Sequence, residues 1–325
     1  MLEVLLVLLR FSLQTLLVHE LFKTQSQNWK PLKMKIADIL IAILVVTIWG
    51  FNFVVIKLGL QGLTPILFSG LRFTFAALPL VLFVKKPAIP AKLLIGYGVF
   101  QFALQFTLLF SGIKLGFAAG LASMVIQLQA FFTIGLAALL LKEVPKRMQL
   151  MGALIALLGM GLVAIHLEEK ATLIGFVLVV AGGVCWAIAN ILTKKMGAVN
   201  PLGLVIWASL IASPLVLICS LLIEGPSAWT EAYAKLNWLS IGAVLFQSYP
   251  NTILGFGLWS MLIRKYNVAS VAPFSLLVPI SGMISASFIL DEPLQWWKIV
   301  AGLLVIFGLG LSQFGSRIFS KGKVA

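Results

Sequence analysis

The sequence predicts an all-α integral membrane protein with ten transmembrane helices, arranged as two inverted five-helix repeats. Three observations lead to this fold class: the apolar composition, the placement of the basic residues, and a weak internal similarity. Of the 325 residues, 61% are apolar and only 10% are charged, and the mean hydropathy is +1.09. Water-soluble domains contain about 25% charged residues. The composition therefore excludes a soluble enzyme or binding module.

The apolar residues fall into stretches long enough to cross a bilayer. A membrane-spanning helix needs about 20 consecutive, mainly apolar residues, and such stretches recur from Ile36 to Phe314 with short polar joints between them. They predict helices at residues 37–56, 65–84, 92–111, 117–140, 148–166, 172–193, 202–223, 238–262, 269–290 and 296–314. Cys185 and Cys219 both lie in apolar stretches, which favours packed core residues over a disulfide or a metal site.

The net charge of +14 comes from basic residues at the ends of the apolar stretches, which indicates contact with the bilayer surface and no nucleic-acid partner. If the chain starts in the cytoplasm, fourteen basic residues fall on the cytoplasmic side. Five fall on the other side, namely Lys57, Lys114, Lys170, Lys235 and Lys298. Because basic residues resist translocation, both termini are predicted to be cytoplasmic. That topology requires an even number of spans, in agreement with ten.

Residues 1–33 form an N-terminal extension that does not fit this scheme. Residues 2–21 are apolar but include Glu3, Arg10, His19 and Glu20. No small-residue cleavage motif follows them, which argues against a cleaved signal sequence. The alternatives are an interfacial amphipathic helix and an upstream start codon with the working start at Met34. At the other end of the chain, residues 317–325 are predicted to form a basic cytoplasmic tail.

A weak internal match predicts a duplication. Trp49 and Lys57 align with Trp186 and Lys194 at a shift of 137 residues, and residues 141 and 143 align with residues 290 and 292 at a shift of 149. The predicted units are residues 34–166 and 167–316. Five helices per unit is an odd number, so the second unit is inserted upside down. Inverted repeats are typical of secondary transporters with a midplane substrate site; the alternative is chance matching between Leu- and Gly-rich helices.

Arg72 is the foremost candidate for a substrate-binding residue. It lies well inside the second predicted helix, and that helix contains no acidic residue. A charged side chain at the bilayer centre costs about 2.5 to 3.5 kcal/mol on insertion scales, so its retention suggests a function. A guanidinium facing a wet cavity would bind a substrate carboxylate. Alternatively, Arg72 snorkels or donates to backbone carbonyls of a neighbouring helix.

The other candidates for substrate binding are amide and indole side chains inside the predicted helices. They are Trp49, Asn52, Gln101, Gln105, Gln127, Gln129, Trp186, Asn190, Gln247 and Asn251. Gln101 and Gln105 are four residues apart, as are Gln247 and Asn251, so each pair shares one helix face. Amides donate and accept hydrogen bonds without carrying charge, which suits a small zwitterion. For each amide, a hydrogen bond between helices is the alternative.

The sequence predicts no enzyme, no catalytic residue, no cofactor and no metal site. A membrane-bound transferase needs paired carboxylates or a histidine near an acid, and neither His19 nor His166 lies in an acid-rich cluster. The absence of a G-x-x-x-x-G-K-[ST] loop excludes ATP as the driving force within this chain. No Asp or Glu lies near a span centre, which leaves facilitated efflux and ion coupling both open. A passive channel is a further alternative, and the oligomeric state is not predicted.

Four segments resemble the EamA family of the drug/metabolite transporter superfamily. They are WGFNFVVIKLGL (49–60), GLRF (70–73), GLASMVIQLQAFFTI (120–134) and SLLVPISGMISASFILDE (275–292). The similarity covers about residues 34–313 and, within the family, is to bacterial exporters of O-acetylserine and cysteine. It implies two inverted five-helix repeats around a central cavity, and gradient-driven efflux across a bacterial inner membrane. Ala130 departs from the family pattern, because many members have a proline there, as Pro279 is in the second repeat.

Together these observations predict an exporter of small amino acids or their derivatives that works by alternating access, with O-acetylserine and cysteine as the expected substrates. Related exporters carry threonine, homoserine, aromatic amino acids or nucleobases, which are the alternative substrates. Arg72 is predicted to hold the substrate carboxylate. Asn52, Gln105, Gln127 and Asn190 are predicted to recognise the polar remainder of the molecule.

Overall fold

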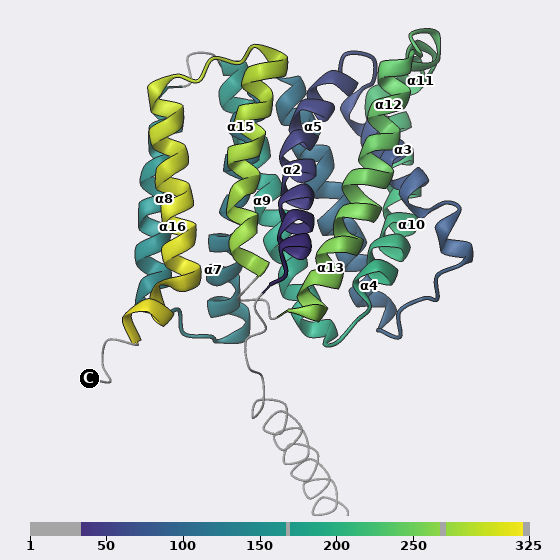
Figure 1. The fold of residues 1–325 in the computed structure, drawn as a ribbon. Coiled ribbons are helices and arrows are strands. Elements are labelled where there is room, and N and C mark those ends of the chain that lie inside the picture. The colour runs from purple at the N-terminus through teal and green to yellow at the C-terminus, as the bar shows by residue number, and fades with distance from the viewer. Residues whose placement is uncertain (1–33, 167–169, 267–270, 321–325) are drawn as a thin grey trace, which may run out of the picture.

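The computed structural model describes residues 34–166, 170–266 and 271–320, and every element within these ranges is helical (Figure 1). The N-terminal extension and residues 321–325 of the predicted tail lie outside them. Eight stretches are long and apolar enough to cross a membrane: residues 36–59, 65–82, 91–114, 119–141, 147–165, 173–196, 201–234 and 296–315. A shorter apolar helix covers residues 274–290. The chain is therefore a multi-pass membrane protein, and the ten-span count stays a prediction.

The first half of the chain contains three helical stretches that include irregular segments and two that are regular. The elements are α2 (Ile36–Gly59), α3 (Pro65–Ala77), η1 (Leu80–Leu82), α4 (Ala91–Tyr97), η2 (Gly98–Leu104), α5 (Gln105–Lys114), α6 (Ala119–Val125), η3 (Ile126–Leu128), α7 (Gln129–Leu141) and α8 (Arg147–Ile165). The helix predicted for residues 65–84 ends at Ala77. Pro79 explains the earlier end, because proline lacks an amide hydrogen and its ring clashes with a continuing helix.

The second half of the chain has a similar succession of regular and irregular helices. Its elements are α9 (Lys170–Met196), α10 (Pro201–Cys219), η4 (Ser220–Glu224), α11 (Gly225–Ala234), α12 (Trp238–Phe246), η5 (Gln247–Leu254), α13 (Gly255–Lys265), η6 (Ala272–Leu276), α15 (Leu277–Leu290) and α16 (Trp296–Ser320). Residues 225–234, which lie between the predicted helices 202–223 and 238–262, are also helical. Both η2 and η5 are π-helical, and such wide turns occur often at functional sites.

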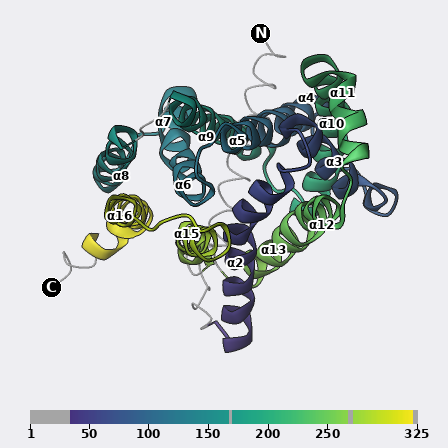
Figure 2. The same cartoon turned by 90° about the horizontal axis from the view of Figure 1, so that it is seen from above.

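The helices stand side by side in one bundle (Figures 1 and 2). The α8 and α16 helices pack along each other at one side, and α2 lies between α15 and the α12–α13 stretch. Buried aromatic rings fill the space between α3 and the η2–α5 stretch, where Phe73 stacks on Phe102 of η2 with ring centroids 4.8 Å apart. The outer surface is apolar, and Phe288 is 83% exposed. In water such a surface would be an anomaly, whereas lipid chains cover it in a bilayer.

Both ends of the described chain lie at the lower end of the bundle in Figure 1. There the carboxylate of Asp38, in the first turn of α2, accepts hydrogen bonds from Lys265 Nζ at 2.8 Å and from the Tyr266 hydroxyl at 2.7 Å. These contacts tie the start of α2 to the end of α13. They join residues that are more than two hundred positions apart in the sequence.

At the opposite end, two glutamates cap helices that belong to the other half of the chain. Glu224 accepts from the backbone amides of Ile66 at 2.8 Å and Leu67 at 3.0 Å, at the start of α3. Glu292 accepts from the amides of Ala119 at 2.8 Å and Gly120 at 3.0 Å, at the start of α6. A carboxylate is favoured at a helix N-terminus, where the first amides have no partner in the helix.

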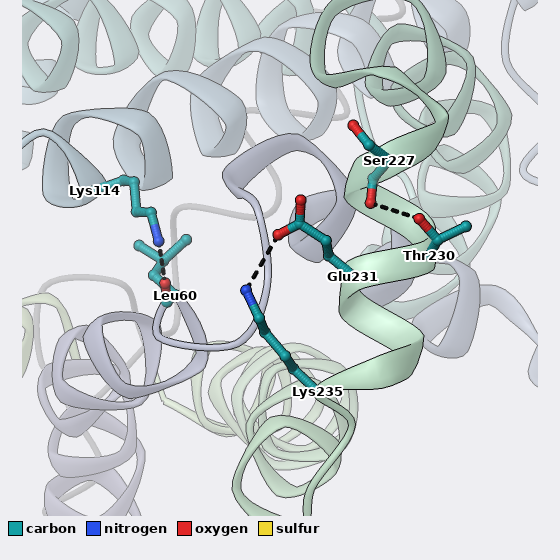
Figure 3. A network of polar contacts seen from close by, with 6 residues as sticks. All are labelled: Leu60, Lys114, Ser227, Thr230, Glu231 and Lys235. Atoms are coloured by element: carbon teal, nitrogen blue, oxygen red, sulfur yellow. Dashed lines mark hydrogen bonds and ion pairs between the residues drawn. The ribbon is translucent and has the colours of Figure 1, made fainter.

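Five lysines were predicted to lie on the side of the membrane opposite the cytoplasm, and three of them donate hydrogen bonds to nearby oxygen atoms. Lys114 donates to the carbonyl of Leu60 at 2.5 Å, and Lys235 pairs with Glu231 at 3.1 Å along α11 (Figure 3). Lys298 donates to the carbonyl of Pro293 at 2.9 Å. These contacts satisfy the ammonium groups close to where the chain enters and leaves the apolar stretches.

Candidate functional site

A cavity of about 350 Å³ lies inside the bundle. Its wall combines residues of α2, α3, η2 and α5 from the first half with residues of α9, η5, α13, α15 and α16 from the second. Its volume falls in the range of about 300 to 1,000 Å³ that is usual for small-molecule sites. The lining includes one cationic side chain, Arg72, and no acidic side chain among the residues described.

Nine of the eleven candidates for substrate binding line this cavity. They are Trp49, Asn52, Arg72, Gln101, Gln105, Gln127, Gln129, Trp186 and Asn251. Asn190 and Gln247 do not. The structure thus brings together polar residues that are up to about 200 positions apart, while their role in binding stays a prediction.

Arg72 is buried, with only 1% of its surface exposed. Its Nη2 donates to the Thr252 hydroxyl at 2.9 Å, whereas Nε and Nη1 have no hydrogen-bond partner. The guanidinium carbon lies 3.9 Å from the centroid of the Phe106 ring and 5.1 Å from that of Phe73. No carboxylate pairs with Arg72 in the described ranges. A cation buried with so few partners is costly unless a ligand or the aromatic rings offset its charge.

The π-helical segment η5 holds Arg72 from the opposite half of the chain. The Thr252 hydroxyl donates to the carbonyl of Gln247 at 2.7 Å, so its oxygen is left to accept from Arg72. The Ser248 hydroxyl donates to the backbone carbonyl of Arg72 at 2.9 Å. Pro250 lies in the same segment. The missing amide hydrogen of Pro250 is compatible with a widened turn, and the carbonyl of Gln247 is satisfied by a side chain five residues on.

Aromatic side chains make up one part of the wall. Trp49 contacts Trp259 and Phe256, with ring centroids 5.2 Å and 5.6 Å apart. The Trp49 indole donates to the backbone carbonyl of Asn251 at 3.2 Å, which joins α2 to η5. Ring faces carry a partial negative charge, so this wall favours a cationic group as well as apolar ones.

The amides of the wall are connected to one another. Gln101 donates to Gln105 at 2.6 Å along one helix face, as their spacing of four residues predicts. Gln247 is fully buried behind the wall. Its side chain donates to the backbone carbonyl of Asn52 at 3.5 Å and accepts from Asn251 at 3.3 Å. Gln247 therefore supports two cavity residues without lining the cavity itself.

Asn190 faces a different neighbour from the one predicted. Its amide nitrogen donates to Gln129 at 2.8 Å and to Thr133 at 3.0 Å, both on α7. It lines a second, smaller pocket of about 180 Å³, where Glu143 pairs with Lys194. Asn190 was predicted to recognise the polar remainder of the substrate, and in the structure its amide contacts α7.

The helices α2, α6 and α15 cross tightly beside the cavity. A Cβ atom at Gly50 would overlap Ser281, and a Cβ atom at Gly282 would overlap Ser123. The Ser281 hydroxyl donates to the carbonyl of Val46 at 3.1 Å across this crossing. Glycine permits such close approach of helices in membranes. Along the chain, Ser123 lies between Gly120, which Glu292 caps, and the cavity residue Ile126, and Gly282 lies between the cavity residue Val278 and Glu292.

Sequence reasoning missed the aromatic residues Phe106, Phe256 and Trp259, which line the cavity together with Ser275 and Gln313. Aromatic side chains are ordinary in membrane helices, so their presence alone gave no signal. An indication existed for Phe106, which follows Gln105 directly and lies one turn beyond Gln101. Groups of three or more metal-binding side chains are absent from the residues described.

The sequence model of the EamA-like transporter family matches the chain twice, over residues 36–165 and over residues 173–313. A Salmonella typhimurium protein named "Probable amino-acid metabolite efflux pump" is 40% identical over 295 residues, which cover 89% of this chain and 98% of its own length. An Escherichia coli protein of the same name is 38% identical, with 86% and 96% covered. An Archaeoglobus fulgidus protein named "Uncharacterized transporter" is 28% identical, with 82% and 95% covered.

A solved crystal structure has a similar fold, with a TM-score of 0.61 over 89% of this chain and 98% of that chain. The two sequences are 16% identical. At this level of identity the likeness concerns the fold alone.

Proposed function

The chain belongs to the EamA-like transporter family, and from this premise we propose that it exports small amino acids or their derivatives by alternating access. It is a membrane transporter and not an enzyme. The observation that carries the proposed substrate class is Arg72, a buried cation in the wall of a cavity that has no acidic side chain. Such a cavity suits a small molecule with a carboxylate.

A substrate carboxylate would supply the partner that Arg72 lacks. Two of its guanidinium nitrogens have no hydrogen-bond acceptor, and charge-assisted hydrogen bonds to carboxylates are about twice as strong as neutral ones. The same site favours a zwitterion over a cationic drug, because the ring faces carry only a partial charge and the cavity wall offers no carboxylate to balance a second positive charge. Arg72 therefore acts as the anchor for the carboxylate of an amino acid.

The relatives support amino-acid metabolites as the substrate class. Two bacterial relatives at 40% and 38% identity are named probable amino-acid metabolite efflux pumps. O-acetylserine and cysteine are the substrates to test first, because the sequence resembles exporters of these compounds. Threonine, homoserine, aromatic amino acids and nucleobases are the comparison set.

Two inverted repeats account for several coincidences of position. The family model matches the two halves separately. Lys142 and Asp291, which end α7 and α15 in the left-handed conformation, are 149 residues apart, and so are the first residues of η2 and η5. The connection after α7 lies at the lower end of the bundle and that after α15 at the upper end (Figure 1). An inverted repeat explains equal turns at opposite ends.

The proposed topology places both termini in the cytoplasm, with the chain in the bacterial inner membrane. The two described ends of the chain lie at one end of the bundle (Figure 1). Fourteen of the basic residues counted above lie on that side in the predicted topology, against five on the other. In this orientation we propose that the crossing of α2, α6 and α15 is the periplasmic gate of the cavity.

Alternating access then requires the crossing to open while the cytoplasmic side closes. The small residues Gly50 and Gly282 allow a close but separable contact. A substrate-filled cavity at the interface of the two halves is the usual arrangement for such motion.

Counterflow in proteoliposomes tests the transport proposal. The purified protein should exchange labelled O-acetylserine or cysteine with saturation, and a linear dependence on concentration would indicate a channel. Arg72→Ala should lower exchange by at least about tenfold, since a hydrogen-bonded charge pair contributes more than 1.4 kcal/mol. Arg72→Lys should restore it only in part, because lysine keeps the charge but lacks the planar fork.

Lys235→Ala is the matched control, because it removes a positive charge that pairs with Glu231 on the exposed face of α11. Exchange by this variant should equal that of the unchanged protein. Equal expression and insertion are checked by immunoblot of the membrane fraction. Unchanged efflux by Arg72→Ala would remove Arg72 from the site, and metabolite profiling of an overexpressing strain would then name the exported compound.

A further inference from the structure

Most of the unsatisfied polar atoms buried in the protein belong to the cavity. Six buried side-chain nitrogen or oxygen atoms lack a hydrogen-bond partner in the described residues. Four of them belong to cavity-lining residues: Nε and Nη1 of Arg72, Oδ1 of Asn52 and Oδ1 of Asn251. Buried polar groups are almost always satisfied, so a concentration of exceptions requires an explanation. Here the exceptions surround one space that is large enough for a small molecule.

The unsatisfied atoms are chemically of two kinds. Those of Arg72 are donors, and those of Asn52 and Asn251 are acceptors. A free α-amino acid carries the complementary pair of groups, because its carboxylate accepts hydrogen bonds and its ammonium donates three. Neutral carbonyl oxygens are the polar acceptors available to an ammonium group at a site whose lining contains no carboxylate. The ring faces of Trp49 and Trp259 add a favourable field.

The orientation of the Asn251 amide is fixed by a relay that starts at a backbone atom. The carbonyl of Asn52 can only accept, so Gln247 must turn its amide nitrogen toward it. The Gln247 oxygen is then left to accept from the nitrogen of Asn251. As a result Asn251 has its nitrogen engaged and its oxygen free. The relay settles which end of each amide is which.

Gln247 is also connected to Arg72, whose guanidinium nitrogens are the hydrogen-bond donors of the cavity. Its backbone carbonyl accepts from the Thr252 hydroxyl at 2.7 Å, and that hydroxyl accepts from Arg72 at 2.9 Å. One fully buried residue therefore supports both the guanidinium and an acceptor amide. The unsatisfied atoms are themselves buried in the cavity wall, so a substrate reaches them after neighbouring side chains shift. That shift is expected when the cavity closes around its ligand.

We propose that Asn52 and Asn251 accept the α-ammonium group of the substrate, and that Gln247 is the positioning residue that holds the Asn251 oxygen free for it. The proposal rests on the proposed function, in which Arg72 holds the carboxylate. It narrows the substrate class to zwitterions with a free α-ammonium group. Carboxylates whose amine is acetylated or replaced by a hydroxyl are poor ligands of this cavity.

Competition in the counterflow assay tests this selectivity. Exchange of labelled cysteine is measured with three unlabelled competitors: serine, N-acetylserine and glycerate, which has a hydroxyl in place of the amine. For the unchanged protein, serine should inhibit at a concentration at least about tenfold lower than either analogue. This factor is expected because each analogue loses a hydrogen bond that the ammonium group of serine makes. O-acetylserine, which keeps its free amine, should compete as serine does.

The variants separate recognition from general disturbance. The quantity compared is the inhibitory concentration of an analogue divided by that of serine. Asn251→Leu and Gln247→Leu should both lower this ratio toward one, although Gln247 does not line the cavity. Asn251→Asp keeps an acceptor oxygen and should retain the preference for serine, which covers the case that the leucine variants fail to fold. Ser209→Ala, at a buried hydroxyl outside the cavity, is the control and should keep the full ratio.

The outcomes for this proposal and for the proposed function are distinct. If cysteine and other amino acids show no exchange at all, the proposed function fails. If they exchange but N-acetylserine and glycerate compete as well as serine, the function stands and the acceptor site is wrong. An unchanged ratio in folded Asn251→Leu rejects the role of Asn251. The same result in folded Gln247→Leu rejects the positioning role.

Discussion

At the scale of single residues, the central physical question is how the protein tolerates the buried charge of Arg72. Its measured partners in the structure are one hydroxyl and two aromatic rings. The Phe106 ring is the closer of the two, at 3.9 Å from the guanidinium carbon. A cation stacked on a ring away from water gains about 2 kcal/mol or more. Phe106 is therefore expected to stabilise Arg72 in the absence of substrate.

A double-mutant cycle measures this contact. Phe106→Leu and Arg72→Met are made singly and together, and thermal unfolding is followed in detergent. The coupling between the two positions should be about 1 to 2 kcal/mol, because each single variant already removes the stacked pair. Phe106→Trp keeps a ring face and should unfold close to the unchanged protein. Additive effects of the two substitutions would mean that the ring contributes packing alone.

The polar residues of the cavity were predictable because polar groups are costly in apolar helices. Nine of the eleven candidates named from the sequence line the cavity. Asn190 and Gln247 lie outside the lining, since the sequence does not give the neighbour that a buried amide meets. The aromatic wall was missed because aromatic side chains cost nothing in a membrane. An aromatic ring contributes to a binding site when a cation lies on its face, and the sequence does not show which rings lie next to Arg72.

At the scale of elements, Glu292 stands out because it joins the two halves of the chain. It follows α15 and binds two backbone amides at the start of α6. Its counterpart at a shift of 149 residues, Glu143, pairs with Lys194 at the other end of the bundle. Equivalent residues thus have different partners at the two ends. This difference fits a transporter that is closed at one end.

Removing the charge of Glu292 should favour opening of the closed end. Glu292→Gln keeps the shape but loses two charge-assisted hydrogen bonds, each typically about 1.5 to 3 kcal/mol. In a background lacking Cys185 and Cys219, a cysteine at the cavity position Ala130 reports access from the side of Glu292. A membrane-impermeant maleimide should label it several-fold faster in Glu292→Gln. Glu231→Gln, on the same side of the bundle, is the control, and equal labelling rates would exclude a closing role for Glu292.

At the scale of the whole molecule, composition and charge placement predicted a helical membrane protein, and the structure confirms that class. The irregular segments η2 and η5 were not predicted, because π-helical turns depend on which tertiary partner satisfies the released carbonyls. Pro250 lies inside η5, but η2 contains no proline, so the same irregularity occurs without a common sequence signal. The conformation of the transporter was equally beyond the sequence. Both conformations of an alternating carrier use the same residues, and small differences in packing decide between them.

The inverted relation of the halves makes a prediction for the whole molecule. The connections after α7 and α15 have equal turns, at Lys142 and Asp291, but lie at opposite ends of the bundle (Figure 1). Single cysteines at the exposed positions Val144 and Leu294, in the background without native cysteines, should therefore react from opposite sides. In intact spheroplasts an impermeant maleimide should label Leu294→Cys and leave Val144→Cys unlabelled. Permeabilised membranes, as the control, should label both. Labelling of both positions from outside would contradict the inverted repeat. The reversed pattern would contradict the predicted orientation, which rests on the rule that basic residues resist translocation.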